Sequence, residues 1–333
     1  MTPPLKERIT PTLTRVAIPI PFPMKYVYCY LFQDDEEVTL VDAGFHYQPA
    51  QEAWQHLFMQ LNIQPQQVSR IILTHFHPDH SSLAGWLQEL TGATVLISAP
   101  DYEMMHKLWG PENFMAEKLS ALFSEHGVPN SLVQQILESM AKIKERVTPF
   151  PQLTILEQSQ IVLGGETWEV IPTPGHSVGH LCFYQRERQW LITADHILDR
   201  ITPNISYWPE VTPNPLKQYL DSLKKIKSLP VTKGLTAHGK VLEQVHARVD
   251  ELLQHHDQRI QKVRHLIGDQ ANAYQVASKL FDHLNLTPHQ WRFALAESLS
   301  HLEYLRLAGE LDWETDQHGI IYYSPSCSAG RTI

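Results

Sequence analysis

The stretch "THFHPDH", residues 74–80, places three histidines and one aspartate close together in the chain. Imidazole and carboxylate groups are the side chains that most often bind zinc and iron in proteins. If the preceding strand continues through His75 and His77, these two point the same way, because side chains alternate along a strand. The proline that follows would turn the chain, so that Asp79 and His80 face a second point nearby. The stretch therefore predicts a metal site.

The sequence around this stretch alternates between strand and helix patterns. "VSRIILTHFH" (68–77) predicts a strand that runs into the histidines, and "SLAGWLQELTG" (82–92) predicts a helix that ends at a glycine. Further strand patterns occupy residues 26–32, 37–44 and 93–99. The histidines thus lie at the carboxyl end of a strand, where α/β folds commonly bind their ligands. We expect an α/β fold.

Residues 101–150 depart from this alternation. Apolar side chains recur at helical spacing in "FMAEKLSALF" and again in "SLVQQILESMAKI", and no strand pattern lies between them. We interpret the segment as a helical insertion, which serves either as an extra packing layer or as a cap over the active site. Its methionine, leucine and phenylalanine side chains would suit the apolar wall of a substrate pocket.

The second half of the chain contains two hairpin patterns and then a helical region. Strand patterns cover residues 160–176, with a turn at Gly164–Gly165, and residues 181–197. After about residue 245 two helix patterns precede a final hairpin pattern, an order that resembles a winged helix. We therefore predict a catalytic domain over residues 1–245 and a C-terminal domain over residues 246–333.

Composition limits the classes of function. The chain has 27 Lys and Arg against 36 Asp and Glu, a formal net charge of -9, whereas nucleic-acid-binding domains usually present a basic surface. None of its cysteines forms a CxxC pair, which argues against a cysteine zinc site and for a reducing compartment. The N-terminal stretch has too many prolines and charges for a signal peptide, and no apolar run is long enough to span a membrane. We expect a cytoplasmic protein.

The histidine stretch also resembles a known family signature. "HFHPDH" is similar to the HxHxDH motif of the metallo-β-lactamase fold superfamily, and four further motifs resemble those of the family in the same order. They are "LVDAG" (40–44), "TPGHS" (173–177), "TADHI" (193–197) and "TAHG" (236–239). The resemblance covers roughly residues 12–240. It implies an αββα sandwich, to which the residue patterns add the helical insertion and a small C-terminal helical, winged-helix-like region.

The resemblance implies that the chain binds two divalent metal ions. Three of the motifs supply His176, Asp195 and His238 as further ligands. The first ion would then take His75, His77, His176 and Asp195, and the second would take Asp79, His80, His238 and the shared Asp195. Six ligands in addition to a shared carboxylate are too many for one tetrahedral zinc. Zinc is the expected metal, with iron or manganese as alternatives.

Other residues in or near the motifs are expected to hold the ligands, to act on the attacking water or to line the substrate pocket. Asp42 is expected to hold a ligand histidine by its second ring nitrogen, and Asp79 to orient the attacking water or to carry its proton. His180 and His196 adjoin ligand motifs and are expected to support the site without binding metal. In "NISYWPE", Tyr207 and Trp208 are candidates for the substrate pocket, with ordinary aromatic packing as the alternative.

The implied function is that of a metal-dependent hydrolase. A hydroxide that bridges the two ions would attack a small ester, thioester or lactone. The alternative is a phosphodiesterase or endoribonuclease of the same fold, which the winged-helix-like tail favours. A binding module without chemistry is a third hypothesis, against which the intact ligand set argues. We expect a small-molecule substrate and neither membrane nor nucleic acid as partner, and a homo-oligomer is left open.

Overall fold

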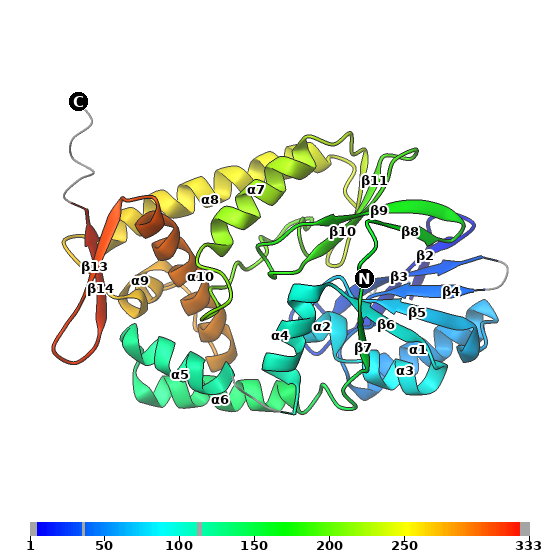
Figure 1. Cartoon of the computed structure of the whole chain (residues 1–333), viewed down its shortest axis with the longest axis horizontal. Coiled ribbons are helices and arrows are strands. Elements are labelled where there is room, and N and C mark those ends of the chain that lie inside the picture. The colour runs from blue at the N-terminus through cyan, green and yellow to red at the C-terminus, as the bar shows by residue number, and fades with distance from the viewer. Residues whose placement is uncertain (1–4, 35–36, 112–114, 327–333) are drawn as a thin grey trace.

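The computed structural model describes residues 5–34, 37–111 and 115–326 (Figure 1). It contains two mixed β-sheets with helices on their outer faces, and a helical region that ends in a two-stranded hairpin. Residues 112–114 of the predicted insertion and 327–333 of the predicted C-terminal domain lie outside the described residues. The predicted α/β class is confirmed, and so are the two-sheet sandwich and the small C-terminal region.

The first sheet has seven strands, whose order in space is their order in the sequence. The pairs from β1 to β4 are antiparallel, and those from β4 to β7 are parallel. The strands are β1 (Lys6–Arg8), β2 (Leu13–Pro19), β3 (Tyr26–Gln33), β4 (Val38–Val41), β5 (Val68–Ile72), β6 (Thr94–Ile97) and β7 (Leu153–Ile155).

The second sheet has five strands, in the order β12, β11, β10, β9, β8. Only β11 and β12 are parallel to each other. The predicted turn at Gly164–Gly165 is confirmed, since it joins β8 to β9 and both glycines have positive φ. The strands are β8 (Gln160–Leu163), β9 (Glu166–Pro172), β10 (Leu181–Gln185), β11 (Trp190–Ala194) and β12 (Lys233–Thr236).

Strand β3 shows why the two sheets pack face to face. Tyr30 and Phe32 belong to a buried cluster that also contains side chains of the second sheet, such as Phe183. Cys29 and Leu31 project to the other side, into the larger core beneath the helices. Because both faces of the strand are buried, its sequence is almost continuously apolar instead of alternating.

The helices cover the outer faces of both sheets and form the region beyond them (Figure 1). A 3-10 turn, η1 (Pro65–Gln67), precedes β5. The α-helices are α1 (Gln48–Leu61), α2 (Pro78–Ser81), α3 (Ala84–Thr91), α4 (Ala99–Trp109), α5 (Met115–Glu125), α6 (Asn130–Lys144), α7 (Pro215–Lys227), α8 (Val245–Ile267), α9 (Ala273–Leu280) and α10 (Pro288–Leu307).

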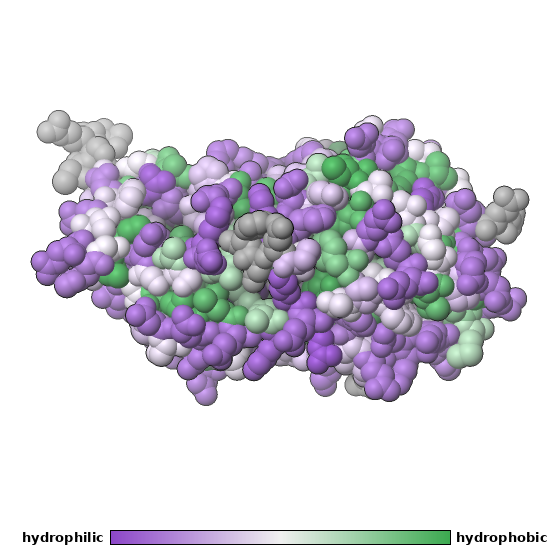
Figure 2. All heavy atoms as spheres, turned by 60° about the horizontal axis from the view of Figure 1, so that its bottom comes forward, coloured by the Kyte–Doolittle hydropathy of each residue, from purple (hydrophilic) through white to green (hydrophobic). Residues whose placement is uncertain are grey.

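The predicted insertion forms α5, α6 and most of α4, between the parallel strands β6 and β7. Its apolar side chains are largely buried, including Met115, Phe123 and Ile136. Figure 2 shows the face that carries this region, where hydrophilic residues predominate and hydrophobic ones form separate patches. The helices therefore turn most of their apolar surface inward.

The strand predicted over residues 68–77 is too long, because β5 ends at Ile72. The Leu73 N–H still donates to Leu96 of β6, and after it side-chain carboxylates become the hydrogen-bond acceptors. The backbone N–H of Thr74 donates to Asp42 Oδ1 at 2.8 Å, and that of Phe76 donates to Asp101 Oδ2 at 3.1 Å. The metal-ligand stretch is thus an irregular loop followed by α2, so period-two alternation is not what orients its histidines.

The C-terminal region has the predicted order of two helices, α9 and α10, and a hairpin of β13 (Leu311–Thr315) and β14 (Ile321–Pro325). The predicted boundary near residue 245 falls at the start of α8, and one continuous apolar cluster runs through both sides of it. The division into domains and the winged-helix comparison therefore stay predictions. Among the described residues, no helix has both the length and the apolar character needed to cross a membrane.

Helix α10 should contribute to the stability of the whole molecule. Leu299 is fully buried in the large core, so Leu299→Ala should destabilise the protein by about 2–5 kcal/mol. Leu284 is 49% exposed, and Leu284→Ala should change stability by no more than about 0.5 kcal/mol. Denaturant unfolding of both variants checks this. Equal stability of the two would show that α10 does not belong to the core.

Candidate metal centre

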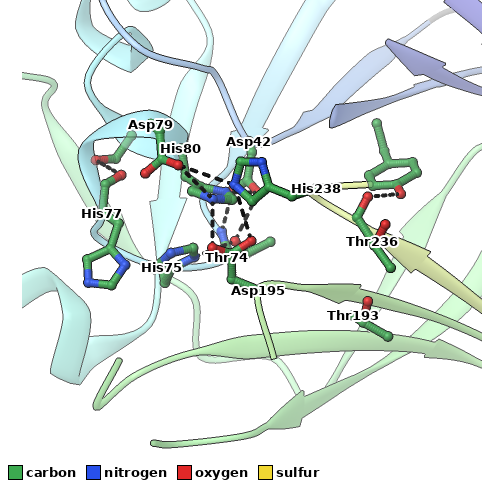
Figure 3. A network of polar contacts seen from close by, with 12 residues as sticks. Asp42, Thr74, His75, His77, Asp79, His80, Thr193, Asp195, Thr236 and His238 are labelled. Carbon is green, nitrogen blue, oxygen red and sulfur yellow. Dashed lines mark hydrogen bonds and ion pairs between the residues drawn. The ribbon is translucent and has the colours of Figure 1, made fainter. Parts of the chain in front are cut away.

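The predicted ligands follow strands of both sheets and meet at one site, and all of them except His176 are labelled in Figure 3. His75 and His77 lie in the loop after β5, and α2 carries Asp79 and His80. The remaining three follow strands of the second sheet, as His176 after β9, Asp195 after β11 and His238 after β12. The two packed sheets end their strands at the same edge, which brings together residues far apart in the sequence.

The ligand atoms fall into overlapping groups. His75, His77 and His176 form one group whose ligand atoms all lie within 4.8 Å of one another. Asp79, His80 and His238 form another, and a third joins His75 and His80 to Asp195. The structure thus brings all seven predicted ligands together, and their division between two ions stays a prediction.

Asp195 lies between the two groups. Its Oδ2 is 3.4 Å from His176 Nε2, and its Oδ1 is 3.5 Å from His238 Nε2. Two ligand atoms bound to one zinc at tetrahedral angles are roughly 3.3 Å apart. Asp195 Oδ2 is also 3.5 Å from His80 Nε2, so the carboxylate lies at the spacing of a shared ligand from both groups.

Most of the histidines present one ring nitrogen to the site and are held by the other. His80 Nδ1 lies 2.8 Å from Asp42 Oδ2, His176 Nδ1 lies 2.8 Å from the Asn204 carbonyl, and His238 Nδ1 lies 3.0 Å from the Tyr26 carbonyl. These oxygens accept hydrogen bonds, so each Nδ1 carries a proton and Nε2 is the nitrogen that faces the site. Their orientation suits metal binding.

Several ligand atoms are buried without a hydrogen-bond partner in the described structure. They are the Nε2 atoms of His75, His80 and His238 and the Oδ1 atom of Asp195. His77 Nδ1 also faces His176 Nε2 at only 2.9 Å. Buried polar atoms that lack partners are costly, and a cation between these atoms would satisfy them. The residues therefore fit the divalent ions that the motifs imply.

The electrostatics of the site also favour a cation. Burial lowers the pKa of His75 and His77 well below the usual value, and neighbouring histidines lower it further, so both are neutral and ready to bind metal. Burial raises the pKa of Asp79, but His80 and His238 more than offset this and bring it to about 2. Ionised carboxylates and neutral imidazoles are the forms in which these groups bind metal.

Asp42 connects two parts of the ligand set, as Figure 3 shows. Its Oδ1 accepts the backbone N–H of Thr74, and its Oδ2 accepts the Thr74 hydroxyl at 2.9 Å and the His80 ring N–H. The Thr74 hydroxyl in turn lies 2.9 Å from His75 Nδ1. This geometry agrees with the expectation that Asp42 holds one ligand histidine, which is His80. Through the Thr74 hydroxyl, Asp42 also contacts a second ligand histidine, His75, indirectly.

Asp101 is a supporting residue that the motifs did not reveal. It is fully buried at the start of α4 and accepts hydrogen bonds from Phe76 N, from Ser177 Oγ at 2.6 Å and from Gly179 N at 2.7 Å. It therefore connects the loop of His75 and His77 with the loop of His176. In the sequence it is an acidic residue in the first turn of a helix, which is too common to signal this role.

His180 and His196 are buried beside the site but belong to none of the ligand groups. The His180 ring lies 5.1 Å from that of His75, and its Nδ1 is 2.9 Å from Thr173 Oγ1. Burial lowers the pKa of His196 to about 3, so it is neutral. Both positions agree with the supporting role expected from the sequence.

A cavity of about 290 Å³ adjoins the ligands. Its walls are mostly apolar and come from the predicted insertion, from the turn between β2 and β3, from the segment after β11 and from α10. The apolar lining residues include Phe22, Met24, Phe76, Trp109, Met140, Ile143, Ile201, Trp208 and Phe293. The expectation that the insertion supplies apolar pocket walls is confirmed.

Of the two aromatic candidates for the pocket, only Trp208 lines this cavity. Tyr207 lines a separate hollow that also involves Glu303 and Tyr323, so its place in the substrate pocket stays a prediction that this cavity does not support. The Tyr207 backbone N–H donates to the carbonyl of Ala296, which holds this segment against α10. Because neighbouring side chains in an extended segment project to opposite sides, Tyr207 and Trp208 face different hollows.

Comparisons with known proteins agree with this arrangement. The family model described as metallo-beta-lactamase superfamily matches residues 23–238, and the model of the metallo-beta-lactamase-like C-terminal domain matches residues 260–326. The crystal structure of the metallo-beta-lactamase family protein TTHA1429 from Thermus thermophilus superposes with a TM-score of 0.85 at 32% identity, covering 96% of this chain and all of that one.

Two curated relatives extend the comparison. The "Probable metallo-hydrolase YqjP" of Bacillus subtilis is 24% identical over 89% of this chain and 92% of its own length. The "Atrochrysone carboxyl ACP thioesterase" of Aspergillus fumigatus is 23% identical over 76% of this chain and 66% of its own length.

Metal content should respond differently to two ligand substitutions. His238→Ala removes a ligand from one group only and should leave about one ion per chain, whereas Asp195→Ala removes the residue between the groups and should weaken both sites. Mass spectrometry of dialysed protein measures this. One ion per wild-type chain, unchanged in His238→Ala, would show that Asp79, His80 and His238 support a single metal.

Asp101→Asn should lower both stability and metal affinity. Either placement of the new amide NH₂ would face a backbone N–H donor, that of Phe76 or that of Gly179. The free energy of unfolding should fall by about 1–3 kcal/mol. Asp312→Asn on an exposed strand is the matched control. Thermal unfolding and zinc titration give the two readouts, and a variant equal to wild type in both would refute the bridging role.

Proposed function

The chain belongs to the metallo-β-lactamase superfamily, and from this premise we propose that it is a binuclear, metal-dependent hydrolase of a small ester, thioester or lactone. The observation that carries the proposal is the position of the ligand set, at one end of a small and mostly apolar cavity. A volume of about 290 Å³ suits a compact acyl group better than a macromolecule.

Divalent ions held by these residues would lower the pKa of a coordinated water and polarise the scissile carbonyl group. Imidazole and carboxylate ligands suit zinc, iron and manganese, and zinc is the metal we propose. Asp42 and Asp101 would keep the ligand loops in place during turnover, because both hold their partners by buried hydrogen bonds.

Asp79 is suited to orient the attacking water. Its pKa of about 2 makes it a weak base that stays ionised near neutral pH, and a nearby cation would lower this pKa further. An ionised carboxylate accepts a hydrogen bond well but holds a proton poorly. Of the two roles expected for Asp79, the geometry and charge favour orientation over proton transfer.

The apolar walls would hold the acyl part of the substrate and exclude water from it. Trp109, Met140 and Ile143 come from α4 and α6, and Phe293 comes from α10. Methionine and aromatic side chains adapt to apolar groups of different shape. The similarity to an acyl-carrier-protein thioesterase supports a thioester among the candidate substrates.

The phosphodiesterase or endoribonuclease alternative has less support. Apart from the histidines, the lining of the cavity contains one basic side chain, Arg292. Polynucleotide binding draws most of its affinity from several cations that contact successive phosphates, and the net charge of -9 opposes it.

Purified protein should hydrolyse at least one activated carboxylic substrate, and metal removal should abolish the reaction. We would assay a p-nitrophenyl ester, a thioester, a lactone and a phosphodiester before and after treatment with a chelator, and then after adding zinc or manganese. Turnover of the carboxylic substrates should fall at least about hundredfold and recover with metal. Equal turnover without metal would refute the proposal, and faster phosphodiester cleavage would favour the alternative.

A further inference from the structure

We infer that Arg292 selects the substrate by binding an anionic group on it, a carboxylate or a phosphate, inside the cavity that adjoins the metal ligands. This inference rests on the proposed function and narrows its substrate class. It gives the C-terminal helix α10, which lies outside the five ligand motifs, a direct part in substrate recognition.

Arg292 is buried without a partner. Its exposed fraction is 8%, and among the described residues no side chain or carbonyl forms a hydrogen bond or ion pair with it. Its Nε atom is buried and unsatisfied. Arg15, which is buried to a similar extent, instead donates to the carbonyls of Thr236 and Gly239 and pairs with Glu7. Burying an unpaired cation is unfavourable, and an anionic group bound to Arg292 would offset this free-energy cost.

The guanidinium group is held in place by aromatic rings. Its central carbon lies 4.0 Å from the ring centre of Phe293 and 5.5 Å from that of Trp208. These contacts position the charge but leave the N–H donors unsatisfied. Such a planar group with free donors matches the two oxygens of a carboxylate or phosphate.

The acidic groups nearby have other partners. Glu297, one of the closest acids on the same helix, accepts a hydrogen bond from Asn204 Nδ2 at 2.7 Å. Asp79 and Asp195 also line the cavity, but both belong to the metal-ligand set. Burial lowers the pKa of Arg292 only to about 10, so the side chain still carries its charge at neutral pH.

The rest of the cavity defines the remainder of the ligand. Apart from the metal ligands and Arg292, its lining contains no charged side chain in the described residues, and most of it is apolar. The substrate expected is therefore a short acyl compound with an apolar body and one anionic group. That group could sit on the acyl part as a carboxylate or on the leaving group as a phosphate.

The test compares neutral and anionic substrates of equal length. We would prepare thioesters that end in a methyl group, a carboxylate or a phosphate, and measure kcat/KM for the wild type, Arg292→Met and Arg292→Lys. The preference of the wild type for one anionic form should fall at least about tenfold in Arg292→Met, mainly through KM, and less in Arg292→Lys. Arg186→Met, at a side chain that is 69% exposed, controls for the loss of one positive charge.

A binding measurement separates this inference from the proposed function. Calorimetry on zinc-loaded protein would compare aliphatic dicarboxylates with monocarboxylates of the same length, in the wild type and in Arg292→Met. A dicarboxylate advantage that disappears in Arg292→Met supports the inference even if no thioester is hydrolysed. If the wild type shows no anionic preference, or if Arg292→Met weakens neutral and anionic ligands equally, Arg292 is a packing residue and the inference is overturned.

Discussion

The ligand loop after β5 depends on two buried carboxylates. Beyond Ile72 the chain leaves the sheet, so its backbone N–H groups need acceptors in a region that water does not reach. Asp42 accepts from Thr74, and Asp101 accepts from Phe76, so the backbone on both sides of His75 is held by a side chain. The same two carboxylates also hold His80 and the loop of His176. The positions of the ligand histidines in these two loops and in α2 therefore depend on a few charge-assisted hydrogen bonds.

This arrangement concentrates negative charge in a buried place. Burial lowers the pKa of His80, but Asp195, Asp42 and Asp79 together raise it well above the usual value. The carboxylates thus favour positive charge so strongly that they overcome the cost of burying it. Metal cations would neutralise these carboxylates more effectively than a protonated His80, because they would also bind the unpartnered nitrogens of His75 and His238. Stability of the site and affinity for metal are therefore coupled.

Apart from the predicted metal ligands themselves, most residues that line the cavity come from other parts of the chain than those ligands. The ligands lie at strand ends of the two-sheet core, while Trp109, Met140 and Arg292 come from the insertion and from α10. A rigid sandwich can in this way keep one chemistry while helices packed against it set the size and charge of the cavity. The burial of Arg292 among aromatic rings is consistent with this division.

The sequence by itself determined the kind of site and much of the fold. Ligand-type residues in four ordered motifs predicted the His and Asp cluster that the structure brings together, and the glycine pair at 164–165 predicted its hairpin, because both depend on local residue chemistry. Only the tertiary structure decided where β5 ends, that Asp101 connects two ligand loops, and that Trp208 but not Tyr207 lines the cavity. These features depend on partners distant in the chain, and a periodic pattern carries no information about them. The same holds for Arg292, whose burial depends on the packing of α10 in the fold of the whole chain.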